Sequence, residues 1–176
     1  MNALDAILTA QQSGAARGIA ALCSAHPLVL EAAMRHASLQ AAPLLIEATC
    51  NQVNQYGGYT GMQPADFVRY VANLAERSGF PRQNLLLGGD HLGPLVWAQQ
   101  PAAIAMLKAK ELVQAYALAG FGKLHLDCSM PCADDANLPV ELIAQRTTEL
   151  VAVAEESCAR AGLLLPRYVI GSEVPP

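Results

Sequence analysis

Short apolar runs alternate with longer amphipathic segments along this chain, and no other feature limits its fold as strongly. Each short run is nearly continuous in apolar residues, as expected of a strand covered on both faces in a parallel sheet. The candidate strands are Gly18–Ser24, Leu44–Cys50, Asn84–Asp90, Lys123–Cys128 and Arg167–Gly171. Because strands and helices alternate, the sequence predicts repeated βα units, which are typical of α/β folds.

Proline and glycine mark the ends of the segments between these runs. A proline stands at the start of each segment, at positions 27, 64, 101 and 139, and a glycine follows three of them, at 79, 120 and 162. Proline is favoured in the first turn of a helix and glycine just past its end. Each of these segments is therefore predicted to be a helix, and a further short helix is expected ahead of the first strand.

The composition and charge of the chain argue against two classes of binding partner, nucleic acids and membranes. The 176 residues include 53% hydrophobic and 15% charged residues, with a net charge of −4 and scattered basic residues. No basic stripe indicates nucleic-acid binding, and no apolar run reaches the roughly 20 residues that cross a bilayer. The first residues lack the features of a signal peptide, so we expect a cytoplasmic protein with its five cysteines reduced.

Polar side chains gather where the candidate strands end, which is where ligand sites form in βα folds. The residues we single out there are Glu47, Asn51, Asn54, Asp90, His91, Asp127, Ser129 and Glu173. Loops can be polar without placing acidic residues and histidines at the ends of strands. The sequence therefore predicts a ligand site at one mouth of the fold.

The adjacent pair Asp90 and His91 is the most specific feature of this group. A neutral imidazole is a good Zn²⁺ ligand, and a neighbouring carboxylate can move a proton at a metal-bound carbonyl or hydroxyl. The alternative is that Asp90 caps a turn and His91 is a hydrogen-bonded loop residue. The spacing alone does not separate these two hypotheses.

Three further residues have both a functional and a structural interpretation. Glu47 lies inside an apolar strand, where an ionised carboxylate is costly without a partner, which favours a functional role. Asp127 either orients a sugar hydroxyl or a metal-ligand histidine, or caps a turn. His125 shares a strand face with Asp127, and a lone histidine on a strand is more often a hydrogen-bonded core residue than a ligand.

Several nucleotide-binding and hydrolase motifs are missing. The chain has no G-x-x-x-x-G-K-[ST] sequence, no G-x-G-x-x-G between a strand and a helix, and no G-x-S-x-G elbow. A P-loop kinase, a dinucleotide-binding domain and an α/β-hydrolase are therefore disfavoured.

Five blocks of sequence resemble a known family. They are CSAHPLVLEAA, LIEATCNQVNQYGGYTGMQPADF, GGDHLGP, HLDCSMPCADD and YVIGSEVPP, which together span nearly the whole chain in the family's order. The chain closely resembles the Z-type subunit of D-tagatose-1,6-bisphosphate aldolase, the GatZ/KbaZ family. Some relatives carry the name tagatose-6-phosphate kinase, which the missing P-loop does not support.

The resemblance implies a (β/α)8 TIM barrel in cytosolic tagatose, galactitol or N-acetylgalactosamine catabolism. It also implies a subunit that gives the Y-type catalytic subunit of a class II aldolase, a zinc lyase, its activity and stability. Other relatives resemble metal-dependent ketose or ketose-phosphate 4-epimerases, so an enzyme of that kind remains the alternative. A ketose phosphate ligand and a homo-oligomer are further expectations.

The same resemblance implies roles for individual residues. In class II aldolases an Asp-His pair supplies a proton-transfer residue and a zinc ligand, so Asp90 is the catalytic candidate and His91 the ligand of Zn²⁺ or another divalent metal. Glu173 is a second catalytic candidate. The expected substrate-binding residues are Glu47, Asn51, Asn54, Asp127 and Ser129.

Two departures from the family pattern matter. Leu95 stands where the family usually has asparagine, so a polar contact at the mouth is absent. Family members are also considerably longer than this chain, which stops just past a strand. We therefore expect residues 1–176 to be the N-terminal portion of one barrel, with about five of its eight βα units, inactive alone and without the other histidines of a metal site.

Overall fold

The fold is built on one five-stranded parallel sheet in which the strands follow one another in sequence order, β1-β2-β3-β4-β5. This is a computed structural model, and it describes residues 3–171. The strands are β1 (Ala21–Cys23), β2 (Leu44–Thr49), β3 (Leu85–Leu92), β4 (Lys123–Leu126) and β5 (Arg167–Ile170). Sequential parallel order is the arrangement of a (β/α) barrel, in which each helix returns the chain to the start of the neighbouring strand.

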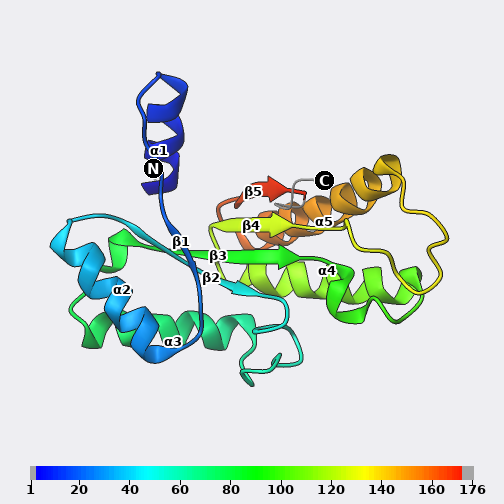
Figure 1. Cartoon of the computed structure of the whole chain (residues 1–176), viewed down its shortest axis with the longest axis horizontal. Coiled ribbons are helices and arrows are strands. Elements are labelled where there is room, and N and C mark those ends of the chain that lie inside the picture. Colours follow the sequence, from blue (N-terminus) through cyan, green and yellow to red (C-terminus); the bar gives the residue numbers. More distant parts are fainter. Residues whose placement is uncertain (1–2, 172–176) are drawn as a thin grey trace.

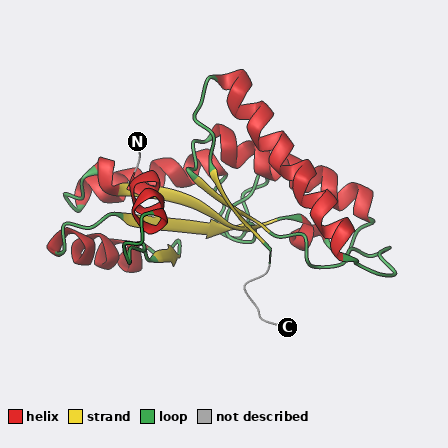
Figure 2. Cartoon of the chain, turned by 90° about the horizontal axis from the view of Figure 1, so that it is seen from above, coloured by secondary structure: helices red, strands yellow, loops and turns green. Residues whose placement is uncertain are grey.

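Helices connect the strands and cover one face of the sheet (Figure 1). They are α1 (Ala3–Gln12), α2 (Pro27–Leu39), α3 (Pro64–Arg77), α4 (Ala102–Leu118) and α5 (Val140–Ala161), with short 3-10 helices η1 (Arg82–Asn84) and η2 (Pro94–Trp97). Viewed from above, the strands fan out with the twist of a parallel sheet (Figure 2). The architecture confirms the predicted α/β fold as an incomplete (β/α)8 barrel.

The helix starts follow the predicted chemistry. Gln63 precedes α3, Pro64 occupies its first turn, and the backbone N–H of Gln63 donates to the Asp66 carboxylate over 3.0 Å. This reciprocal capping satisfies N–H groups that a helix start leaves without partners. The apolar side of the helix, with Phe67 and Val71, is fully buried against the sheet.

Successive residues of each strand face opposite sides of the sheet. The outer side of β2 presents Leu44, Ile46 and Ala48 to the main apolar core under the helices. Its inner side presents Glu47, which is buried as well. The inner side therefore carries the polar groups that the sequence placed at the strand ends.

The strand and helix bounds largely follow the prediction, with one difference that matters for the site. The bounds of α2 agree, and β1 is shorter than the run Gly18–Ser24. The third strand was expected to end at Asp90, but β3 continues to Leu92. Asp90 thus lies inside the strand rather than at its end, and His91 lies inside the strand rather than in the loop after it.

The first helix stands apart from the others (Figure 1). Arg167 of β5 holds α1 in place, because its guanidinium donates to the Asp5 carboxylate from Nε (2.9 Å) and from a terminal nitrogen (2.7 Å). None of the helices within residues 3–171 is long and apolar enough to cross a membrane.

Candidate functional site

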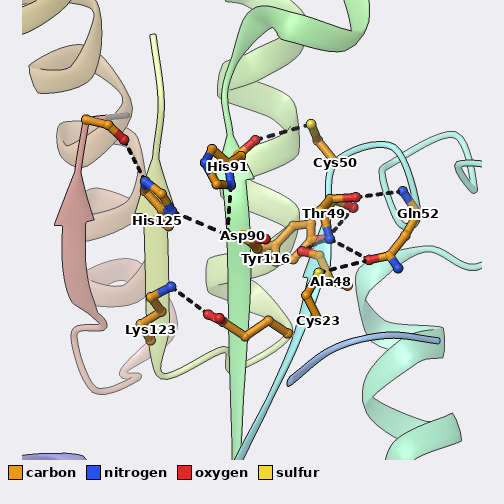
Figure 3. Close-up of polar contacts among 12 residues, drawn as sticks. Cys23, Ala48, Thr49, Cys50, Gln52, Asp90, His91, Tyr116, Lys123 and His125 are labelled. Atoms are coloured by element: carbon orange, nitrogen blue, oxygen red, sulfur yellow. Dashed lines mark hydrogen bonds and ion pairs between the residues drawn. The ribbon is translucent and has the colours of Figure 1, made fainter. Parts of the chain in front are cut away.

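Asp90, His91 and His125 converge on the inner side of the sheet (Figure 3). Nδ1 of His91 lies 2.9 Å from Oδ1 of Asp90, and Nδ1 of His125 lies 3.3 Å from the same oxygen. The two imidazole centroids are 4.2 Å apart. One carboxylate oxygen is therefore shared between histidines of two neighbouring strands.

An irregularity in β3 allows two adjacent residues to face the same site. The register between β3 and β4 shifts between Gly89 and Leu92, and His91 has a φ of +48°. A non-glycine residue in this region is strained and depends on its surroundings. The Cys50 thiol, which is buried, donates to the His91 carbonyl over 3.2 Å and helps to hold this turn of the backbone.

The ends of β3 and β4 touch at Gly93. A Cβ atom built on Gly93 would lie 1.9 Å from the carbonyl oxygen of Asp127, so only glycine fits. The N–H of Asp127 donates to the Leu92 carbonyl over 3.0 Å, which joins the same two segments. This close approach brings the chain after His125 next to the chain after His91.

The surroundings keep Asp90 ionised. Burial alone would raise its pKa, but the charge of His91 and hydrogen bonds from Cys23, His125 and His91 outweigh burial and lower the pKa below its ordinary value. Burial, reinforced by the Asp90 charge, raises the pKa of the Cys23 thiol to about 12. Cys23 is thus a neutral thiol, which donates to Oε1 of Gln52 over 3.4 Å, rather than a nucleophile.

Glu47 lies deeper, beside Lys123. Nζ of Lys123 is 2.6 Å from Oε1 of Glu47, and their side chains are 11% and 5% exposed. Burial raises the pKa of Glu47, and Lys123 opposes that shift. A Cβ on Gly88 would lie 2.4 Å from Oε1 of Glu47, so the intervening glycine leaves room for the ion pair.

The loop after β2 uses Asn54 to organise its own backbone. The Asn54 amide donates to the Cys50 carbonyl (2.9 Å), and its oxygen accepts from the N–H groups of Tyr56 (2.9 Å) and Gly58 (3.1 Å). Asn51 is exposed at the start of this loop. The Tyr116 hydroxyl, brought by α4, donates to the Val53 carbonyl over 2.9 Å and ties the helix to the same loop.

The remaining predicted residues lie near the end of β4 or outside the described range. Asp127 Oδ1 accepts from the backbone N–H of Ser129 over 2.8 Å, which forms a turn directly after the strand. Glu173 lies outside the described residues, which end at residue 171. The structure thus brings Asp90 and His91 together and places Asp127 and Ser129 beyond the neighbouring strand end.

His125 is the residue whose part in this cluster the sequence did not single out. It is 0% exposed, and its Nε2 lies 2.6 Å from the carbonyl oxygen of Gly171 just past β5. The sequence placed it on the face of Asp127, but the neighbour that matters, Asp90, comes from another strand. The useful signal was that a histidine one residue before the end of β4 lies beside the Asp-His pair of β3 in a parallel sheet.

The donor set fits a divalent metal. One ligand atom from each of Asp90, His91 and His125 lies within 4.8 Å of the others. Metal–ligand bonds of about 2.0–2.1 Å separate neighbouring ligand atoms by about 3.0–3.4 Å, close to the 2.9 Å and 3.3 Å between the Asp90 oxygen and the two histidine nitrogens. Carboxylate and imidazole suit Zn²⁺ and related metals, and a carboxylate beside them suits proton transfer.

Comparison with known proteins agrees with this architecture. Residues 4–176 match the family described as D-tagatose-1,6-bisphosphate aldolase subunit GatZ/KbaZ-like. The crystal structure of a probable tagatose 6 phosphate kinase from Sinorhizobium meliloti 1021 is 56% identical, with a TM-score of 0.83 over 90% of this chain and 40% of that one. This chain thus spans less than half the length of that protein.

A more distant structure shares the fold. The crystal structure of the YdjI aldolase from Escherichia coli K12 is 15% identical, with a TM-score of 0.52 over 93% of this chain and 49% of that one. At this identity the likeness concerns the fold alone. The match across residues 4–176, supported by the 56% identical structure, shows that the chain belongs to the D-tagatose-1,6-bisphosphate aldolase subunit GatZ/KbaZ-like family.

Proposed function

We propose that this chain is the N-terminal part of a (β/α)8 subunit of class II tagatose-1,6-bisphosphate aldolase. Its role is to support the activity and stability of a Y-type catalytic subunit in the cytoplasmic catabolism of tagatose, galactitol or N-acetylgalactosamine. The observation that carries this proposal is the family match over residues 4–176.

A binding experiment tests the subunit role. The full-length protein should co-purify with a Y-type aldolase subunit and raise its thermal midpoint, because binding to a native state stabilises it by mass action. At a partner concentration of 100 times Kd the stabilisation is about 2.7 kcal/mol. Unchanged melting and unchanged turnover of the catalytic subunit at saturation would exclude this role.

A second candidate function is a metal-dependent 4-epimerisation of a ketose or ketose phosphate. The observation that favours it is the convergence of Asp90, His91 and His125, since a purely supporting subunit needs no such cluster. Zn²⁺ or another divalent metal held there would polarise a substrate oxygen as a Lewis acid. His91 would be a ligand, and His125 lies beside it.

Asp90 has the properties that the proton transfer needs. It is ionised, side-chain exposure is 16%, and hydrogen-bond donors fix its orientation. As the C3–C4 bond of the ketose breaks, its electron pair stays on the C1–C3 fragment as an enolate, C4 becomes an aldehyde, and the carboxylate accepts the C4 hydroxyl proton. It returns that proton to the same oxygen when the bond forms again on the other face of the aldehyde.

The two functions differ in a direct assay. An epimerase should interconvert tagatose 6-phosphate and fructose 6-phosphate without any Y-type subunit, and turnover should require a divalent metal. Metal-loaded full-length protein that leaves both sugars unchanged would exclude this second function while leaving the subunit role intact. Phosphate-free ketoses in the same assay would show whether phosphate is required.

A further inference from the structure

The two nitrogens of His125 have different environments, and this difference assigns a role to each. Nε2 faces the carbonyl oxygen of Gly171 at 2.6 Å, whereas Nδ1 faces Oδ1 of Asp90 at 3.3 Å. A carbonyl oxygen only accepts hydrogen bonds, so Nε2 carries a proton. Nδ1 donates to the carboxylate oxygen when it carries a proton, and it offers a lone pair at the same place once that proton has left.

A proton on Nδ1 joins the imidazole to the Asp90 carboxylate, and a metal cation can take the place of that proton. Burial strengthens this contact, because His125 is 0% exposed and water does not screen it. Nδ1 of His91 also lies 2.9 Å from the same Asp90 oxygen. Three electron-pair donors from two strands therefore point toward one small volume.

We propose that His125 is the second histidine ligand of the metal, bound through Nδ1, with its Nε2–H oriented by the Gly171 carbonyl. The proposal rests on the metal site described above and names a ligand within this chain that the family resemblance did not supply. A histidine ligand commonly donates its other N–H to a backbone carbonyl, which fixes its tautomer and raises its basicity.

This assignment has a structural consequence. The proposed ligands come from β3 and β4, and the carbonyl that orients His125 follows β5. Metal binding would therefore link the C-terminal ends of three consecutive strands. The hydrogen bond from Nε2 would connect metal binding to the backbone at Gly171.

Metal affinity of variants gives the first test. Zn²⁺ is titrated into the apo full-length protein against a competing chelator, for the wild type, His125→Gln and His91→Ala. Glutamine keeps an N–H donor near the position of Nε2 and removes the Nδ1 ligand. His36→Gln, on the exposed end of α2, is the matched control.

We expect His125→Gln to weaken Zn²⁺ binding by at least about 10–100-fold, the loss that even the groups orienting a ligand commonly cause. His36→Gln should bind as the wild type does. Wild-type affinity in His125→Gln, with a loss in His91→Ala, would overturn the role of His125 and keep the metal site. Wild-type affinity in both variants would overturn the metal site itself.

A spectroscopic measurement on the wild type does not depend on whether a variant folds. Long-range ¹H–¹⁵N correlation of the imidazoles should show Nε2 of His125 protonated in the apo protein and in the Cd²⁺-loaded protein. With ¹¹³Cd²⁺, a coupling to Nδ1 of His125 is expected. A coupling to Nε2, or none to either nitrogen while the metal is bound elsewhere, would overturn the proposal.

Discussion

Two neighbouring layers of side chains on the inner side of the sheet differ in how their charged groups are arranged. In the deeper layer, Glu47 and Lys123 neutralise one another across Gly88, with 2.6 Å between the charged atoms. In the layer above it, Asp90 faces the Nδ1 atoms of His91 and His125. The deeper layer pairs opposite charges, whereas the upper layer brings together side chains that bind protons and metal ions.

The difference separates a structural role from a chemical one. A buried ion pair with matched partners is costly to break but need not take part in any reaction. Electron-pair donors that converge from neighbouring strands are stable in the folded protein only when a proton or a cation lies between them. The deeper layer is therefore expected to control stability, and the upper layer to control binding and turnover.

Asp90→Asn should have the largest effect of these variants, and the quantity it lowers should be the turnover. If the full-length protein is an epimerase, turnover should drop by about 10²–10⁴-fold, because the amide cannot accept the proton. The variant should remain folded, since asparagine has nearly the same shape as aspartate. Wild-type turnover in this variant would reduce Asp90 to a structural residue.

Lys123→Met should have the largest effect on folding. Removal of one partner leaves the Glu47 charge buried and unpaired, which costs about 3–5 kcal/mol. Urea unfolding would measure this loss. The matched control is the double variant Glu47→Leu with Lys123→Met, which should recover most of the stability because both charges are gone. A single variant as stable as the wild type would show that the deeper layer is not structural.

Gly88→Ala tests the same layer from the glycine side. The added methyl group would lie 2.4 Å from Oε1 and 3.0 Å from Cγ of Glu47, so the ion pair must move. Overpacking of this kind costs about 1–3 kcal/mol. Thermal unfolding should show the loss, and Gly122→Ala, where no atom lies within 4 Å of the added methyl, is the control for glycine removal. Equal melting of both variants would argue against crowding at Glu47.

Cys50→Ala should have the smallest effect. It tests whether the contact of Cys50 with the His91 backbone supports the metal site of the upper layer. It removes the hydrogen bond to the His91 carbonyl, which is worth about 0.5–1.5 kcal/mol, and a small buried volume. Zn²⁺ affinity should fall as the turn at His91 loosens. Cys158→Ala, which truncates another fully buried cysteine on α5, should keep the affinity. An equal affinity in both variants would separate Cys50 from the metal site.

The elements of this fold could be predicted because they depend on local chemistry. Apolar runs gave the strands, and proline with glycine gave the helix limits, as the agreement at Pro27–Leu39 shows. The end of β3 was harder, because the sequence ends the strand at Asp90 and places His91 in the following loop. The strand continues to Leu92 through a register shift and a positive φ at His91, whose carbonyl accepts a hydrogen bond from Cys50 at the end of another strand. Contacts between strands of this kind are not visible in the sequence.

The candidate site was only partly predictable for the same reason. Asp90 and His91 are adjacent in sequence, so their pairing was visible. His125 and Lys123 acquire their partners across strands, and the partner is set by sheet register. Glu47 is buried as its place in an apolar strand predicted, whereas its functional role stays a prediction. The sequence did not reveal that a lysine 76 positions away is its partner.

The glycines of β3 and of the loop after it also differ in whether another residue can replace them during evolution. At Gly88 and Gly89, the atoms that crowd an added methyl belong to side chains, those of Glu47, Leu92 and Tyr116. A substitution there can be accompanied by a smaller neighbour, so these positions are free to covary. At Gly93 the obstacle is the backbone of Asp127, which every amino acid carries. No second substitution compensates for that, and position 93 should stay invariant wherever these two strand ends meet.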